Sequence, residues 1–381
     1  MKDGGQTGMA RWTGRTLVVA ALALCVAACA SRPEDTADDL ALALAAKVAV
    51  NSGDGTPLPV PRHLAPEAVP GHHQQVLLLS GGGSHGAFGA GVLVGWTESG
   101  QRPRFDIVTG VSTGALMATF AFLGPEYDGV LRHLYTNVES RQIYKDRGIG
   151  GLLKGSAYDQ KPLARQLERE IDDRVIASVA GECAGGRRLF IATTNLDKGL
   201  QVVWDMCAIA TSTSPGKAGL YRKILLASAA IPGIFRPVYI QSNSAMPSLH
   251  VDGTIHSSLL FHSFMLAEDG GQDVWTIING KIDYARRDGF ADANVTSTVP
   301  RAILEMMKAN TNASVYRTYV QVRRARARFH LAHVPDDFPD TSPIEFKPGE
   351  MGALFEAGQE AGRTRRWADE PPRLEPLDRI P

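Results

Sequence analysis

A serine lies between two glycines in the segment Gly110-Val111-Ser112-Thr113-Gly114. The segment follows residues 105–109, which predict a strand, and precedes residues 113–122, which predict a helix. This setting is typical of a nucleophile elbow, in which a sharp turn exposes the serine hydroxyl above the start of a helix. The two glycines would permit the turn, and the helix N-terminus would favour developing negative charge. Ser112 is therefore the candidate nucleophile.

Three successive glycines, Gly81-Gly82-Gly83, form a second strand-to-helix turn after the apolar run at residues 76–80. Backbone amides without neighbouring side chains can point into one cavity, as an oxyanion hole requires. The rival interpretation is a nucleotide-phosphate loop, because Gly81, Gly83 and Gly86 have the spacing of the dinucleotide fingerprint. That fingerprint needs an acidic residue after the next strand, whereas Asp106 precedes the core of that strand. The pattern therefore favours an oxyanion loop.

A serine nucleophile needs a base within hydrogen-bond reach, and a carboxylate can serve. Asp252-Gly253 follows a possible strand at residues 248–251, and its glycine would allow a tight turn beside the nucleophile. The competing segment Asp269-Gly270-Gly271 lies in a polar loop and is typical of an ordinary turn. With a reference pKa near 4, Asp252 would remain a proton acceptor across neutral pH.

A Ser-His-Asp triad of the α/β-hydrolase type is the alternative. The histidine comes last in the chain in that arrangement, so His330 and His333 are the candidates. The glycine loop and Ser112 are too close together for the usual spacing of that fold. The spacing therefore favours a carboxylate base.

The remaining chain alternates between strand and helix patterns. Further strands are predicted at residues 188–194, 200–204 and 274–278, where short apolar runs occur. Helices are predicted at residues 86–97, 161–180, 218–230 and 349–362, and a long helix is predicted to start at Pro300. This alternation predicts an α/β fold with a parallel sheet.

Together, the glycine loop, the serine elbow and Asp252-Gly253 resemble, in this order, the motifs of the patatin-like phospholipases. The segment Ala227-Ser-Ala-Ala-Ile-Pro-Gly-Ile-Phe-Arg-Pro237 is similar to the stretch that the family has between nucleophile and aspartate, and it is the most specific match. The resemblance covers about residues 75–280. It implies a three-layer sandwich, in which a mostly parallel central sheet lies between helices on both faces.

The resemblance also implies an activity. A Ser112–Asp252 dyad would hydrolyse acyl lipids or phospholipids without a metal or other cofactor, and Gly82 and Gly83 would donate to the oxyanion. His85 stands where the family often has Arg or Lys, which leaves the charge of the loop open. A non-catalytic lipid-binding or scaffold lipoprotein on the same fold is the competing function.

The N-terminus predicts export to a bacterial cell envelope. Basic residues precede an apolar run at residues 17–28, whose length suits a signal peptide better than a membrane span. The run ends in Val26-Ala27-Ala28-Cys29, which resembles a lipobox with Cys29 as the lipid-bearing anchor. Ordinary cleavage after Ala30 is the alternative. An Asp after the cysteine would indicate inner-membrane retention by resemblance to lipoprotein sorting, so Ala30 favours the outer membrane and a periplasm-facing enzyme.

Composition divides the chain into four parts. Residues 1–28 are the predicted signal peptide, 29–73 a flexible tether that contains a possible short helix at residues 40–50, 74–366 the catalytic domain and 367–381 an irregular tail. The 40 basic and 40 acidic residues balance, which argues against a nucleic-acid partner. An oxidising exterior would allow Cys183 and Cys207 to pair, and two separate buried thiols are the equal alternative. Nothing in the sequence indicates an oligomeric state.

Overall fold

The computed structural model describes residues 40–48, 72–146, 156, 158–241, 246–267, 271–282 and 295–372. The predicted signal peptide and Cys29 lie outside these ranges, as does Asp269. Among the described helices, none combines the length and the apolar character needed to cross a membrane.

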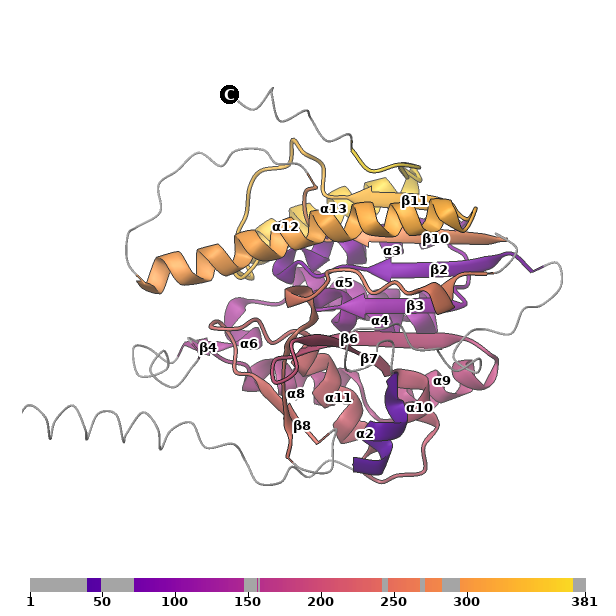
Figure 1. The fold of residues 1–381 in the computed structure, drawn as a ribbon. Helices are drawn as coiled ribbons and strands as arrows, with labels where there is room; N and C mark the ends of the chain where they lie inside the picture. The colour runs from indigo at the N-terminus through magenta and orange to yellow at the C-terminus, as the bar shows by residue number, and fades with distance from the viewer. Residues whose placement is uncertain are drawn as a thin grey trace, which may run out of the picture.

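One nine-stranded sheet forms the centre of the molecule. Its strands are β1 (Lys47–Val48), β2 (Gln74–Leu79), β3 (Ile107–Val111), β6 (Arg188–Asn195), β7 (Leu200–Asp205), β8 (Val238–Ile240), β9 (Ser248–Asp252), β10 (Gln272–Ile278) and β11 (Arg328–His333). Strands β6, β3, β2, β10 and β11 lie side by side and run parallel (Figure 1). Strands β7 and β9 pair with β6 in the antiparallel direction, so the sheet is mixed at one side.

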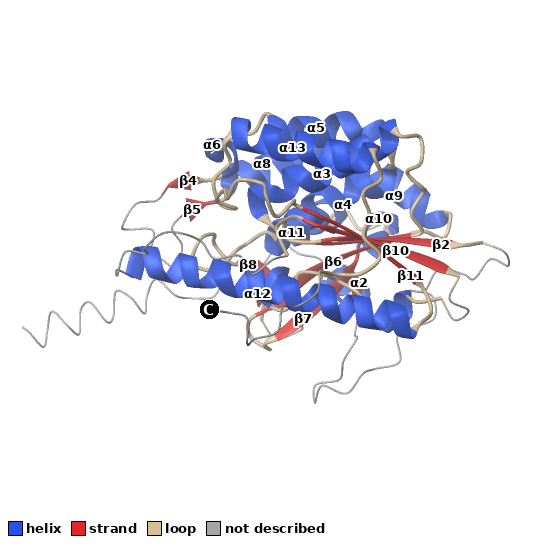
Figure 2. Cartoon of the chain, turned by 90° about the horizontal axis from the view of Figure 1, so that it is seen from above, coloured by secondary structure: helices blue, strands red, loops and turns tan. Residues whose placement is uncertain are grey.

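Helices cover both faces of this sheet (Figure 2). One face carries α3 (Gly86–Glu98), α4 (Thr113–Leu123), α5 (Asp128–Thr136), α8 (Lys161–Glu170), α9 (Asp173–Ala184), α10 (Met206–Thr211), α11 (Lys217–Ser228) and α13 (Pro348–Arg363). The long helix α12 (Val295–Arg324) lies against the other face. Strand β2 is buried on both sides, because Leu77 and Leu79 pack into one apolar cluster and Val76 and Leu78 into the other. The predicted three-layer sandwich with a mostly parallel central sheet is confirmed.

Two predicted helices differ from the structure, and strand β11 was not predicted. The helix predicted at 161–180 is two helices, because the chain turns after α8 and the side chain of Asp172 caps α9 by accepting from the Val175 amide at 2.9 Å. Helix α12 begins at Val295 and contains Pro300. Strand β11 was not predicted, because it directly follows a run of arginines at the end of the long helix, although its residues alternate in part between polar and apolar.

Residues 40–48 contain the short helix that the sequence predicted within the tether, and they pack against the catalytic domain. They form α2 (Leu40–Ala46), which buries Leu42, Ala43 and Ala46, and β1, which pairs antiparallel with β7. The pairing of β1 covers the free edge of β7. The predicted tail also begins with a packed residue, because the ring of Trp367 lies 4.6 Å from that of Trp96.

Cys183 and Cys207 form a disulfide between α9 and α10, with their Cα atoms 5.6 Å apart. Of the two alternatives that the sequence left open, the structure has the paired one. A disulfide of this kind persists in an oxidising compartment and not in a reducing cytosol.

Candidate active site

Ser112 lies in the turn between β3 and α4 with φ 56° and ψ −126°, a backbone conformation that L-residues rarely adopt. The neighbouring glycines allow this turn through close packing. A Cβ at Gly110 would lie 2.5 Å from the Gly114 carbonyl oxygen, and one at Gly114 would lie 2.3 Å from the Leu79 carbonyl oxygen. The sequence Gly110 to Gly114 therefore folds into the strained elbow that its spacing predicts.

Ser112 and Asp252 are in direct contact. The Ser112 hydroxyl donates a hydrogen bond of 2.6 Å to Oδ2 of Asp252, and the other carboxylate oxygen accepts from the Thr254 amide at 2.8 Å. Asp252 ends strand β9, which pairs antiparallel with β6. This pairing brings the carboxylate to the side of the sheet at which β3 ends and the elbow begins. Both side chains are almost fully enclosed, with 3% of Ser112 and 0% of Asp252 exposed.

The segment at residues 227–237 holds both members of this pair. Ser228 accepts from the Ser112 amide at 3.0 Å and donates to the Ala192 carbonyl at 2.7 Å. The carbonyl of Ala230 accepts from the Asp252 amide at 2.9 Å. The sequence singled out this segment only by resemblance and gave Ser228 no role, because a contact between such distant residues depends on the folded chain.

The glycine loop lies beside the nucleophile. A Cβ at Gly81 would come within 3.1 Å of the Ser112 Cβ, and Gly83 has the left-handed φ of +58°. Within the described part of the chain, the amides of Gly82 and Gly83 donate to no protein acceptor, whereas the Ser84 amide donates to the Pro343 carbonyl at 2.8 Å. Two amides are thus available for an external acceptor, as oxyanion stabilisation requires.

Asn279 fixes the start of this loop and was not predicted as a site residue. Its side-chain amide donates to the Ser80 carbonyl at 2.7 Å, and its side-chain oxygen accepts from the Gly89 amide at 3.1 Å. The backbone amide of Asn279 also donates to the Ser80 hydroxyl at 2.9 Å. An asparagine at the end of a buried strand offered no sequence signal for this role.

Burial raises the pKa of Asp252 to about 6, although the hydrogen bonds from Ser112 and Thr254 oppose the shift. The reference pKa near 4 does not hold at this position because enclosing a carboxylate is costly, yet a carboxylate with a pKa of about 6 still accepts a proton at neutral pH. A pKa near the working pH suits a group that must both take and return a proton.

We expect an acid limb in the pH dependence of kcat/KM, with half-maximal activity near pH 6. Only the ionised Asp252 can accept the serine proton, so activity rises as pH increases through this pKa and then levels off. Hydrolysis of a neutral ester between pH 4 and 9 measures the limb, and the same limb should persist in His330→Ala. A half-maximal point near pH 4 would contradict the shifted pKa.

A pocket opens beside Ser112 and Gly83. Its walls are largely apolar side chains from several elements on one face of the sheet, among them Leu116, Phe120, Leu163, Leu167, Ile171 and Phe235. Such a wall can bury a hydrocarbon chain next to the serine hydroxyl.

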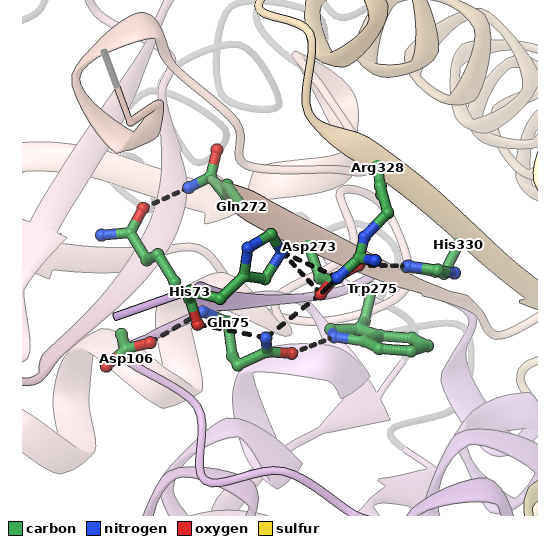
Figure 3. A network of polar contacts seen from close by, with 9 residues as sticks. His73, Gln75, Asp106, Gln272, Asp273, Trp275, Arg328 and His330 are labelled. Carbon is green, nitrogen blue, oxygen red and sulfur yellow. Dashed lines mark hydrogen bonds and ion pairs between the residues drawn. The ribbon is translucent and has the colours of Figure 1, made fainter. Parts of the chain in front are cut away.

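His330, a candidate for the alternative triad, lies at the opposite edge of the sheet. Its ring is hydrogen-bonded to Asp273 at 2.6 Å and stacks against the ring of Trp275 (Figure 3). Asp273 pairs in register with Gln75, and Leu79 pairs with Gly110, so four residues of β2, roughly 13 Å, separate this cluster from the elbow. Arg328 and His330 stabilise ionised Asp273 there, which lowers its pKa despite burial.

His333 and Asp106 are also distant from the serine. His333 ends β11, and β10 and β2 separate that strand from β3, a span of roughly 14 Å across the sheet. Asp106 accepts from the Gln75 amide at 2.7 Å, at the edge where Figure 3 shows the Asp273 cluster, so it does not face the glycine loop. The described residues thus combine Ser112 with a carboxylate and with neither candidate histidine.

Comparison with known proteins gives one family. A family model described as patatin-like phospholipase matches residues 77–265. The solved structure of VipD from Legionella pneumophila is similar at 12% identity and a TM-score of 0.41, covering 88% of this chain and 71% of that one. The heterodimeric ExoU–SpcU complex from the type III secretion system of Pseudomonas aeruginosa is similar at 15% identity and a TM-score of 0.30, covering 77% and 51%. Comparison with curated proteins finds no match.

Proposed function

We propose that this chain, whose residues 77–265 match the patatin-like phospholipase family model, is a serine acyl hydrolase of lipid esters that uses a Ser112–Asp252 dyad. The observation that carries the proposal is the 2.6 Å hydrogen bond from the Ser112 hydroxyl to a fully buried carboxylate. A serine bonded to a base is the general requirement for nucleophilic acyl transfer.

In the proposed first step, the Ser112 oxygen attacks the acyl carbonyl carbon while its proton passes to Oδ2 of Asp252. The carbonyl oxygen becomes an oxyanion, to which the amides of Gly82 and Gly83 donate. Collapse of this intermediate breaks the ester bond, and Asp252 returns the proton to the leaving alcohol. Water then repeats the sequence on the acyl-enzyme, which releases the fatty acid and restores Ser112.

The apolar pocket beside Ser112 would hold the acyl chain during both steps. Burying each methylene there contributes about 0.8 kcal/mol of binding. The pocket therefore supports a lipid acyl ester as the substrate over a small polar ester.

The test is release of free fatty acid from a panel of lipid esters by the purified mature chain. Hydrolysis of at least one acyl ester is the expected result. The competing function, a lipid-binding or scaffold lipoprotein, predicts that the protein binds lipid vesicles and releases no fatty acid from any of them. That outcome would overturn the proposed activity.

We propose, too, that the enzyme is lipid-anchored in the cell envelope and faces the periplasm, at the outer membrane. The lipobox-like sequence ending at Cys29 supports the anchor, and Ala30 supports the outer membrane. The disulfide between Cys183 and Cys207 agrees with an oxidising compartment.

Cys29→Ser should move the protein from the membrane fraction to the soluble fraction or leave it as unprocessed precursor. The thiol is the only group at this position that can accept the lipid, and serine cannot replace it. Membrane fractionation with labelled fatty acid measures the effect, and Cys25→Ser serves as the matched control because it lies within the predicted signal peptide. Equal lipid incorporation in Cys29→Ser would disprove the anchor.

A further inference from the structure

Two polar side chains, Gln166 and Glu170, line the largely apolar pocket beside Ser112. They lie four residues apart on α8, so they are neighbours on one face of the helix. Thr113 and Tyr135 also line the pocket, but their hydroxyl groups are hydrogen-bonded to each other at 3.0 Å. The reaction steps proposed above use Ser112 and leave Gln166 and Glu170 without a role.

Gln166 is an amide enclosed in the protein without a partner. Only 9% of the residue is exposed, and its side-chain amide has no hydrogen bond to any described residue. Glu170 is half-buried and likewise forms no ion pair within the described ranges. Enclosed amides are nearly always hydrogen-bonded, because an unpaired one loses its bonds to water. Since Gln166 lines the pocket, the occupant of the pocket is where its amide finds a partner.

The position of the pair on α8 places it along the acyl chain rather than at the ester. The Gln160 side chain donates to the Arg236 carbonyl at 2.9 Å, so α8 begins beside the segment at residues 227–237 that holds the catalytic pair. Gln166 and Glu170 lie about 9 Å and 15 Å further along the helix axis. The reacting carbonyl lies at the elbow, so the two side chains meet the acyl chain several carbons from the ester.

We propose that this pocket selects an acyl chain that carries a hydroxyl group several carbons from the ester, an inference that rests on the proposed hydrolase function. The Gln166 amide can donate a hydrogen bond, whereas the Glu170 carboxylate can only accept one. A hydroxyl group both accepts and donates, so one hydroxyl bridges the two side chains. A plain hydrocarbon chain leaves both of them unpaired, and a site built to bind a hydroxyl discriminates against the analogue without it.

Gln166→Leu tests the donor. The measurement is the ratio of kcat/KM for p-nitrophenyl esters of mid-chain hydroxystearic acids to that for p-nitrophenyl stearate, all in the same mixed micelles. We expect the wild type to favour a hydroxylated ester about tenfold or more. Gln166→Leu should reduce the ratio to about one or below, because leucine removes the donor and suits the plain chain.

Both esters are measured on one preparation, so a loss of folded protein does not change this ratio. Gln101→Leu, the same exchange at an exposed glutamine after α3, is the matched control and should keep the wild-type ratio.

Glu170→Gln tests the acceptor. The new amide can donate to a carbonyl oxygen, so this variant should gain activity on the corresponding ketostearate esters relative to the hydroxystearate esters. Glu168→Gln, the same exchange at an exposed position of α8, is the control and should leave the relative rates unchanged.

A wild type that prefers none of the hydroxylated esters, or a Gln166→Leu variant with an unchanged ratio, would overturn the hydroxyl site and leave the hydrolase intact. Absence of hydrolysis of every ester by the wild type, including p-nitrophenyl butyrate, would instead overturn the proposed function and the inference with it.

Discussion

Ser112→Ala is expected to lower ester hydrolysis by roughly 10³-fold or more, because the variant has no oxygen to form the acyl-enzyme. The fold should persist, since alanine fits the space of a serine and the elbow depends on the adjacent glycines for its close packing. Asp252 would keep the hydrogen bond from the Thr254 amide. Initial rates on a short acyl ester, with circular dichroism for the fold, measure the effect.

Labelling distinguishes the nucleophile from other serines. A fluorophosphonate probe should react with the wild type and not with Ser112→Ala, and the labelled peptide should contain Ser112. Ser178→Ala is the matched control, because Ser178 is an exposed serine on α9 and far from the elbow in the chain. Near-full activity of Ser112→Ala on the ester would refute the mechanism.

Asp252→Asn should lower turnover by roughly 10² or more, the usual scale for removal of a general base. The amide retains the shape of the carboxylate but cannot accept the Ser112 proton. His330→Ala and His333→Ala should keep most of the activity, since both histidines lie away from Ser112. Asp173→Asn, an exposed aspartate at the start of α9, is the control for the exchange itself. If a histidine variant is inactive while Asp252→Asn remains active, the protein uses a Ser-His-Asp triad and the dyad is refuted.

Asp252→Asn should have a larger free energy of unfolding than the wild type at neutral pH. The folded state raises the pKa of Asp252 from 3.8 to about 6, so above pH 6 it contains a buried carboxylate that the unfolded chain would hydrate. This disfavours folding by roughly 1–3 kcal/mol, and the cost disappears below about pH 4, where both states are protonated. Thermal denaturation should therefore show a Tm advantage for Asp252→Asn at pH 8 and little or none at pH 4. An equal Tm for the wild type and Asp252→Asn at both pH values would contradict the raised pKa of Asp252.

The sequence singled out Ser112 and Asp252, which the structure brings into contact, because local patterns specify both residues. Ser112 is fixed by a strand, a tight turn and a helix that are continuous in the chain, and Asp252-Gly253 ends a recognisable strand. The contact between these residues followed from resemblance and not from a local rule. Nothing in the sequence required β9 to turn back along β6.

Properties that depend on the assembled environment were not predictable in this way. The pKa of Asp252 depends on burial by several distant segments, and the role of Ser228 depends on how α11 ends against the elbow. Strand β11 was missed because an edge strand carries polar side chains, which weakens the apolar signal. The short helix within residues 40–48 was predicted, but its packing against the domain was not, because its neighbours are rich in proline and glycine.

The docking of residues 40–48 changes how far the catalytic domain can travel from a lipidated Cys29. A free tether ending at residue 73 would extend to roughly 150 Å, whereas the ten residues from 30 to 39 extend to about 35 Å. With Cys29 lipidated, a linker of about 35 Å would keep the catalytic domain in a thin layer above the leaflet that carries the anchor. If Cys29 is lipidated, the effective concentration of lipids in that leaflet would be correspondingly high. With the anchor in place, the protein would therefore act on the membrane that carries it.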